Sequence, residues 1–151
     1  MKKYKLITYM LLFAGCLSAQ DNLSALLPMP NQVKQIESKK DFIISGKTTI
    51  QTNLPKDAFC IAELKDILRQ RTGKTPTLSS SGSGSSVIRL ILDPSVKGDG
   101  HYLLSVSEKT VSIKGATQGS ILYGLMTLDQ ILLGDVCRTL SGKIAPIEID
   151  D

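Results

Sequence analysis

Apolar residues recur every three or four positions in residues 57–71, and charged residues occupy the positions between them. The apolar positions are Ile61, Leu64, Ile67 and Leu68. This spacing predicts a helix with one buried and one solvated face. Gly73 follows the pattern and is a candidate cap, because glycine accepts the left-handed backbone conformation that ends many helices.

A second helical pattern, in residues 119–134, is apolar around more of its circumference, and Asp129 is its only charged residue. The residues fall on three sides of the helix. One apolar face carries Ile121, Leu125, Leu128 and Leu132, and a second apolar strip beside it carries Leu122, Met126 and Leu133. The remaining side is expected to carry Ser120, Tyr123, Thr127 and Gln130. Thr117 is a candidate N-cap, and Gly134 is a candidate end. A helix of this kind is usually covered on two sides, so we expect one layer beneath it and another above it.

The rest of the chain shows the alternation and short apolar runs of β-strands. The candidates are residues 33–37, 42–45, 48–52, 87–92, 102–107 and 110–115, the last two forming a predicted hairpin. The order of elements is strands, helix, strand, hairpin and helix. This order predicts an α+β domain with a mixed, largely antiparallel sheet and two helices packed on one face.

Residues 1–19 have the pattern of an export signal: a basic start, an apolar run too short to span a bilayer, and small residues after it. Two processing routes fit this segment. A signal peptidase would cut before Gln20, whereas lipoprotein processing would cut before Cys16 and attach a lipid to it. Both routes predict an exported bacterial protein, periplasmic or associated with the outer membrane.

Composition narrows the function classes. The 151 residues are 42% hydrophobic and 21% charged, as in an ordinary globular domain. Three of the four net positive charges come from Lys2, Lys3 and Lys5, so the chain without its signal carries a net charge of +1. With no Trp and no cluster of basic residues among aromatic ones, the sequence does not support nucleic-acid binding.

Cysteines and histidines are too few for a zinc site, since the chain has one His and no Cys-x-x-Cys pair. Gly98 and Gly100 lack the strand-to-helix context of a phosphate-binding loop. We therefore predict no metal and no cofactor.

Cys60 and Cys137 could form a disulfide in an oxidising compartment, or Cys60 could be a small buried residue of its helix.

Four segments, in this order, resemble the N-terminal accessory domain of family 20 glycoside hydrolases, the bacterial β-N-acetylhexosaminidases. They are LLPMPNQVK at 26–34, HYLLSVSEKTVSIKGAT at 101–117, GSILYGLMTLDQIL at 119–132 and KIAPIEIDD at 143–151. The resemblance implies a zincin-like accessory domain at residues 20–145. It also implies that residues 146–151 begin the linker to a (β/α)8 catalytic barrel, which is absent from this chain.

In such enzymes the helices of the accessory domain lie between its sheet and the barrel. The resemblance therefore supplies the missing layer above the second helix and identifies the predicted inter-domain interface as Leu122, Tyr123, Met126, Gln130 and Leu133. It implies that the glycan substrate is contacted only through the barrel.

The resemblance also implies a substrate-assisted mechanism, in which the 2-acetamido oxygen of the substrate attacks the anomeric carbon. The assisting Glu and Asp belong to the barrel, so we predict no catalytic residue in this chain and expect it to be inactive alone. Asp150 and Asp151 are interpreted as a solvated chain end, because neighbouring residues of an extended segment point to opposite sides. His101, the only histidine, is interpreted as a surface turn residue without a nucleophile partner.

A second function class remains. The chain could be a free-standing, non-catalytic module that binds a partner protein or a glycan through the apolar face of the second helix. Glycan-binding modules usually present aromatic rings to sugars, and aromatic residues are only 5% of this chain. A partner protein is therefore the better form of this alternative.

Overall fold

The computed structural model describes residues 26, 28–37, 40–80, 86–136 and 142–151. In chain order its elements are β1 (Gln32–Gln35), β2 (Phe42–Ile43), β3 (Thr49–Thr52), α1 (Phe59–Thr72), β4 (Thr77–Leu78), β5 (Val87–Leu92), β6 (Tyr102–Val106), β7 (Thr110–Gly115), α2 (Gln118–Val136), β8 (Lys143–Ile144) and β9 (Ile147–Asp150). Within these residues, neither helix combines the length and apolarity of a membrane-spanning segment.

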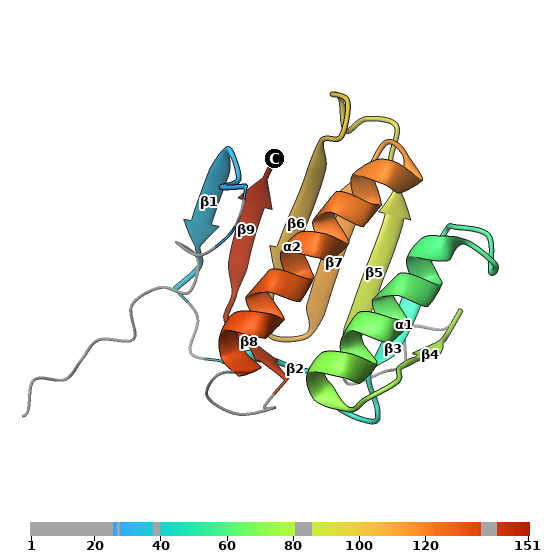
Figure 1. Ribbon diagram of the computed structural model, residues 1–151, viewed down its shortest axis with the longest axis vertical. Coiled ribbons are helices and arrows are strands. Elements are labelled where there is room, and N and C mark those ends of the chain that lie inside the picture. The colour runs from blue at the N-terminus through green and yellow to red at the C-terminus, as the bar shows by residue number, and fades with distance from the viewer. Residues whose placement is uncertain (1–25, 27, 38–39, 81–85, 137–141) are drawn as a thin grey trace, which may run out of the picture.

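Seven strands form one sheet in the order β1-β9-β6-β7-β5-β3-β4, and β2 pairs with β8 in a separate small sheet. Pairings from β1 across to β7 are antiparallel, as is β2 with β8, whereas those from β7 across to β4 are parallel. Both helices lie on the same face of the large sheet (Figure 1). The predicted α+β class, with two helices on one face of a mixed sheet, is confirmed, and the antiparallel pairings make up half of the large sheet.

Helix α1 makes the parallel half of the sheet possible. Parallel strands need a long crossover connection, and α1 lies in the connection from β3 to β5. The antiparallel half instead contains the predicted hairpin of β6 and β7, in which Val106 is paired with Val111. Helix α2 then follows β7 and precedes β8 and β9, the latter returning to pair with β6.

The caps of the two helices follow the sequence prediction except at one end. Gly73 adopts a left-handed conformation with φ of 68°, and its N–H donates to the carbonyl of Arg69. The Ser120 N–H donates to Oγ1 of Thr117 at 3.1 Å, so Thr117 caps α2. The predicted end of α2 at Gly134 is wrong. Gly134 has no positive φ, and the helix continues to Val136.

The C-terminal residues belong to the sheet. Residues 146–151 are predicted to begin a linker, but the structure places β9 at Ile147–Asp150, between β1 and β6 and paired with both. Ile147 and Ile149 are buried. Their alternation with Glu148 and Asp150 is the period-two pattern of a strand with one buried face.

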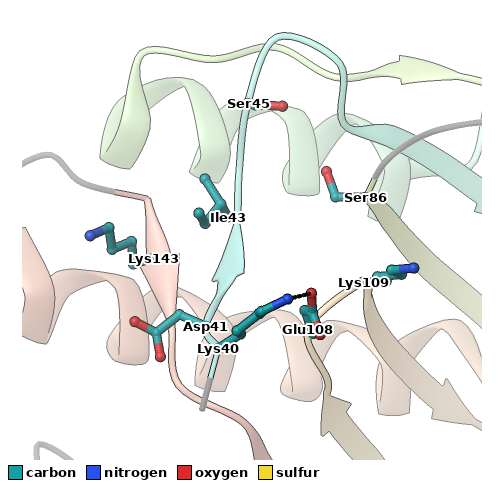
Figure 2. A pocket seen from close by; sticks show the side chains of 8 residues that line it. All are labelled: Lys40, Asp41, Ile43, Ser45, Ser86, Glu108, Lys109 and Lys143. Carbon is teal, nitrogen blue, oxygen red and sulfur yellow. Dashed lines mark hydrogen bonds and ion pairs between the residues drawn. The ribbon is translucent and has the colours of Figure 1, made fainter. Parts of the chain in front are cut away.

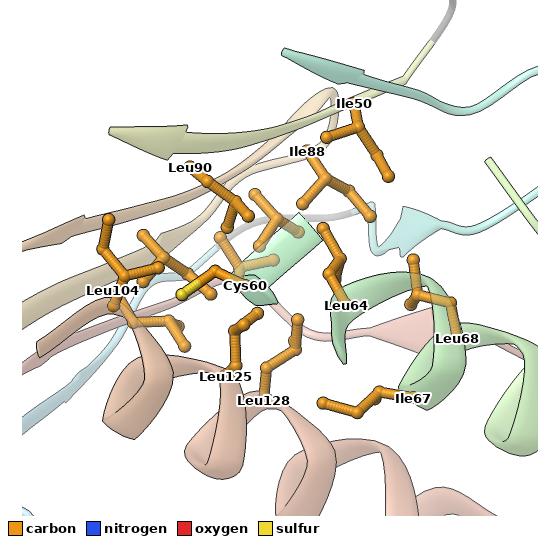
Figure 3. Packing of buried hydrophobic residues seen from close by; sticks show 14 of the residues in the cluster. Ile50, Cys60, Leu64, Ile67, Leu68, Ile88, Leu90, Leu104, Leu125 and Leu128 are labelled. Carbon is orange, nitrogen blue, oxygen red and sulfur yellow. The ribbon is translucent and has the colours of Figure 1, made fainter. Parts of the chain in front are cut away.

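The core lies between the sheet and the two helices (Figure 3). Side chains that are at most 2% exposed come from α1, α2 and the sheet, among them Leu64, Leu68, Ile88, Leu90, Leu104, Ile113, Ile121, Leu125, Leu128 and Leu132. Cys60 is buried in this core, and its thiol donates to the carbonyl of Gln118. Burial is the largest cause that raises the pKa of this thiol. Cys137, the other cysteine of the disulfide alternative, lies outside the described residues.

The opposite face of the sheet is polar. In one row across it, Lys34 is paired in register with Glu148 of β9, and Arg89 with Gln51 of β3. The Arg89 side chain donates to the Gln51 amide at 3.0 Å. A sheet with one apolar and one polar face needs covering on the apolar face alone.

Gly124 lets α2 approach the sheet closely. A Cβ at this position would lie 2.5 Å from Cγ2 of Ile113 and 3.1 Å from the ring of Tyr102. Gly115, the last residue of β7, likewise lets the start of α2 come close to the sheet. A Cβ on Gly115 would lie 2.6 Å from Cβ of Ser120. Glycine inside a helix costs about 1 kcal/mol relative to alanine, and the close packing of α2 on β7 offsets this cost.

We predict that Gly124→Ala destabilises the protein by roughly 1–3 kcal/mol, because overpacking outweighs the better helix propensity of alanine. The control is Gly119→Ala in the same helix, where the new Cβ would meet only Oγ1 of Thr117 at 3.5 Å. This control should be neutral or slightly stabilising. Free energies of unfolding from urea titrations test both changes, and equal effects would contradict the packing role of Gly124.

Candidate functional site

The outer face of α2, turned away from the core, carries all five residues predicted to form an inter-domain interface. Tyr123, Met126 and Leu133 are 57%, 36% and 45% exposed, and Leu122 and Gln130 are half-buried. We call these five residues the outer strip. Their spacing along the helix places them within about 100° of one another, so they form one continuous surface.

Ser120 and Thr127, expected on the remaining side of the helix with Tyr123 and Gln130, are only 1% and 8% exposed and lie outside the outer strip. The Thr127 hydroxyl lies 2.6 Å from the hydroxyl of Tyr102. A buried phenol requires a hydrogen-bond partner, and Thr127 supplies it from α2. Burial is also the largest cause that raises the pKa of Tyr102.

A hollow of about 800 Å³ lies beside the outer strip. We call it the α2 groove. Its walls come from α2, the turn before β6, the end of β9 and the segment before β1, and its lining includes Asn31, Asp99, His101, Tyr123, Met126 and Asp151. The groove therefore combines an apolar wall on α2 with a polar wall on the sheet side.

Asp151 connects three segments at the end of the groove. Its Oδ1 accepts hydrogen bonds from the backbone N–H and the side-chain amide of Asn31 at 2.9 and 2.8 Å. Its backbone N–H and carbonyl both pair with Tyr102. The expectation of a solvated chain end is wrong for this residue, because strand β9 brings it between the segment before β1 and the start of β6.

His101 and Asp150 form an ion pair at the same end, with Nε2 of the histidine 2.5 Å from Oδ1 of the aspartate. The other ring nitrogen, Nδ1, is hydrogen bonded to the carbonyl of Lys97. Both partners are acceptors, so the doubly protonated imidazolium fits this position best. The hydrogen bond to the Lys97 carbonyl is the largest cause that raises the pKa of His101, and Asp150 raises it further.

Tyr123 lies against the turn before β6. A Cβ on Gly100 would lie 3.1 Å from the Tyr123 ring, so the absence of a side chain at Gly100 leaves room for the ring. Gly98 and Gly100 both have positive φ, which agrees with their interpretation as loop glycines. The phenol ring therefore forms a partly exposed edge of the groove.

An ion pair joins the two helices next to the outer strip. Nε and Nη2 of Arg71 donate to the two carboxylate oxygens of Asp129 at 2.7 and 2.9 Å, and each side chain is 25% exposed. The hydrogen bond to Asp129 raises the pKa of Arg71. The sequence contained a signal for this contact, since a lone charge in an apolar helix needs a partner of opposite sign.

A second hollow opens at the other end of the sheet (Figure 2). Lys40, Asp41, Glu108, Lys109 and Lys143 surround it. Nζ of Lys40 lies 3.2 Å from Oε1 of Glu108, and the buried Ser86 hydroxyl lies 2.7 Å from that of Thr48. The described residues show these two hydroxyls bonded to each other, so this hollow offers a mixed-charge surface.

The described residues contain no group of three or more His, Cys, Asp or Glu side chains suited to a metal ion. His101, the one imidazole, is bound to a carboxylate and a backbone carbonyl. The α2 groove and the outer strip together combine apolar side chains, an exposed ring and adjacent carboxylates. This combination suits contact with another protein segment.

The family model for domain 2 of glycosyl hydrolase family 20 matches residues 23–151. No curated protein matches the chain. The match covers every described strand and helix, including β9.

Solved structures that share this fold include β-N-acetylhexosaminidases. The N-acetyl-beta-hexosaminidase of Streptomyces plicatus, in complex with Thio-NAglucal, is 27% identical with a TM-score of 0.68, over 85% of this chain and 26% of that chain. The beta-N-acetylhexosaminidase of Streptomyces coelicolor A3(2) gives the same values. The beta-N-acetylhexosaminidase of Bacteroides fragilis, 11% identical with a TM-score of 0.61 over 83% of this chain and 24% of that chain, shares the fold alone. The chain spans about a quarter of the length of these structures.

We predict that the stabilisation from His101 depends on pH. Because the folded-state pKa is raised above the unfolded value of about 6.5, this stabilisation is complete below about pH 6.5 and is lost as the pH rises through the folded-state pKa. In urea titrations across pH 5 to 9, the difference in free energy of unfolding between the wild type and His101→Gln should therefore shrink with rising pH. A difference that stays constant over this range would contradict the ion pair with Asp150.

Proposed function

The chain belongs to glycosyl hydrolase family 20, of which it carries domain 2, and we propose that it is the accessory domain of an exported β-N-acetylhexosaminidase that removes terminal N-acetylhexosamine from glycans. The hexosaminidases of two Streptomyces species that share 27% identity with it support this assignment. Because the chain spans about a quarter of their length, the hydrolytic activity is proposed for the longer enzyme.

We propose that this domain packs against a catalytic (β/α)8 barrel in the same polypeptide, and the exposed outer strip is the observation that supports this. Fully burying a large apolar side chain contributes about 1.5–3 kcal/mol. Because Tyr123, Met126 and Leu133 are already about half buried, covering the rest of them would contribute roughly half of that value each, about 2–4 kcal/mol in all, which is still a substantial share of the roughly 5–15 kcal/mol that stabilises a typical domain. A surface of this kind is better explained by a permanent neighbouring domain than by exposure to water.

The catalytic groups are assigned to the barrel, so the chain alone is inactive. Substrate-assisted hydrolysis needs an acid beside the glycosidic oxygen and a second carboxylate beside the acetamide. In this domain Asp150 is paired with His101, and Asp151 accepts hydrogen bonds from Asn31. Both carboxylates thus have structural partners, and their role is to hold the corner of the sheet next to the barrel.

Export is proposed from residues 1–19, whose basic start and short apolar run are typical of a signal peptide. The enzyme would then act in the periplasm or at the outer membrane, with a lipid on Cys16 if lipoprotein processing is used.

We predict that the longer enzyme hydrolyses a chromogenic N-acetyl-β-glucosaminide and that this chain alone does not. In that enzyme, Met126→Glu should destabilise the folded state by roughly 2 kcal/mol or more, because a charge would enter a covered apolar surface. In the isolated chain the same change should alter stability little, since Met126 is already partly exposed. Thermal unfolding of both forms measures the difference.

Leu78→Glu is the matched control, because Leu78 is an exposed leucine on β4, outside the outer strip. It should have little effect in either form. If Met126→Glu is equally mild in the longer enzyme and in the isolated chain, no domain covers α2. The free-standing module would then be the better description, with its partner to be sought on this face.

We predict that the polypeptide captured from its own host lacks the export segment. Its intact mass should correspond to a chain that begins at Gln20 or at a lipid-modified Cys16. A Cys16→Ser variant separates the two routes, because it abolishes incorporation of labelled fatty acid only if Cys16 carries the lipid. A mature protein that keeps residues 1–19 would refute export by this signal.

A further inference from the structure

We infer that the α2 groove receives a cationic side chain of the catalytic domain and that this contact positions that domain on the outer strip. The inference rests on the proposed function, because it names one contact within the surface assigned there. It adds a charge requirement to an interface that is otherwise apolar.

Charge complementarity is the first argument. Three carboxylates line the groove, those of Asp99, Asp150 and Asp151, and among the described lining residues only His101 can carry a positive charge. Both Asn31 hydrogen bonds go to Oδ1 of Asp151, so this carboxylate faces the groove from a fixed position. Asp99 is exposed at the turn before β6. A cationic group between Asp99 and Asp151 would offset the excess of negative charge in the groove.

The apolar wall provides the second argument. Arginine and lysine have a long apolar stem that packs along apolar surface while the charged end reaches a carboxylate. Tyr123 and Met126 form such a surface on the α2 side of the groove. The exposed Tyr123 ring can also bind a cation over its face, and a guanidinium does so most readily. The groove thus matches both parts of a cationic side chain.

The position of the groove identifies the occupant. Asp151 lines the groove, and in the proposed enzyme the barrel follows this residue, so the barrel begins beside the groove. A second copy of this chain fits less well. The outer strip contains no Lys or Arg, so two copies joined by their α2 faces would place acidic grooves near each other without a basic group from either strip.

The test follows Met126 in the longer enzyme by hydroxyl-radical footprinting, with oxidation of its sulfur measured by mass spectrometry. In the wild-type enzyme Met126 should be oxidised more slowly than in the isolated chain. Changing Asp99→Asn together with Asp151→Asn should raise the rate in the enzyme roughly tenfold, the change expected when one charge-assisted contact is lost. Raising the salt concentration should act in the same direction on the wild type.

The matched control is Asp57→Asn, an exposed carboxylate before α1 and outside the groove, which should leave the rate unchanged. Circular dichroism of each variant confirms that the domain is folded. Asp99→Asn alone provides the test if loss of the Asp151 contact to Asn31 prevents folding.

Each alternative gives a different result. If Met126 is protected in the enzyme but the groove variants behave like Asp57→Asn, the inference is overturned while the proposed function stands. If Met126 is as reactive in the enzyme as in the isolated chain, both are overturned. Protection that appears only at high protein concentration would mean that a second copy covers the strip, which also overturns the inference.

Discussion

The close approach of α2 to the sheet is the constraint on which the rest of the structure depends. At Gly124 there is no room for a side chain between the helix and Ile113, and at Gly115 none between β7 and Ser120. This approach buries Ile121, Leu125, Leu128 and Leu132 against the core. It leaves the other apolar strip of the same helix facing outward, because a single sheet can cover a helix from one side only.

The corner at the start of β6 has a related role. Asn31, His101, Asp150 and Asp151 join the segment before β1, the turn before β6 and the end of β9. These side chains lie outside the hydrophobic core cluster. They hold the polar wall of the α2 groove at a defined distance from the helix. The groove thus depends on a hydrogen-bonded corner on one side and on helix packing on the other.

Membership of family 20 and the geometry of α2 agree with each other. Three of the exposed large apolar side chains, Tyr123, Met126 and Leu133, lie on the outer strip, which fits the neighbouring domain proposed above. The Arg71–Asp129 pair lies next to this strip and ties the two helices together. The helix layer can therefore present one rigid surface, which is what a stable contact between two domains requires.

The sequence by itself determined both helices, most of the strands and the apolar strip of Leu122, Met126 and Leu133, because these follow from local periodicity and from caps such as Thr117 and Gly73. Tertiary structure decided where residues 147–150 pair: their period-two alternation permits a strand, but only the fold places that strand between β1 and β6. It also decided that Thr127 is buried under the hydroxyl of Tyr102 and that Asp151 meets Asn31, 120 positions away in the chain. Contacts of this kind have no local signal, because they depend on which segments the folded sheet brings side by side.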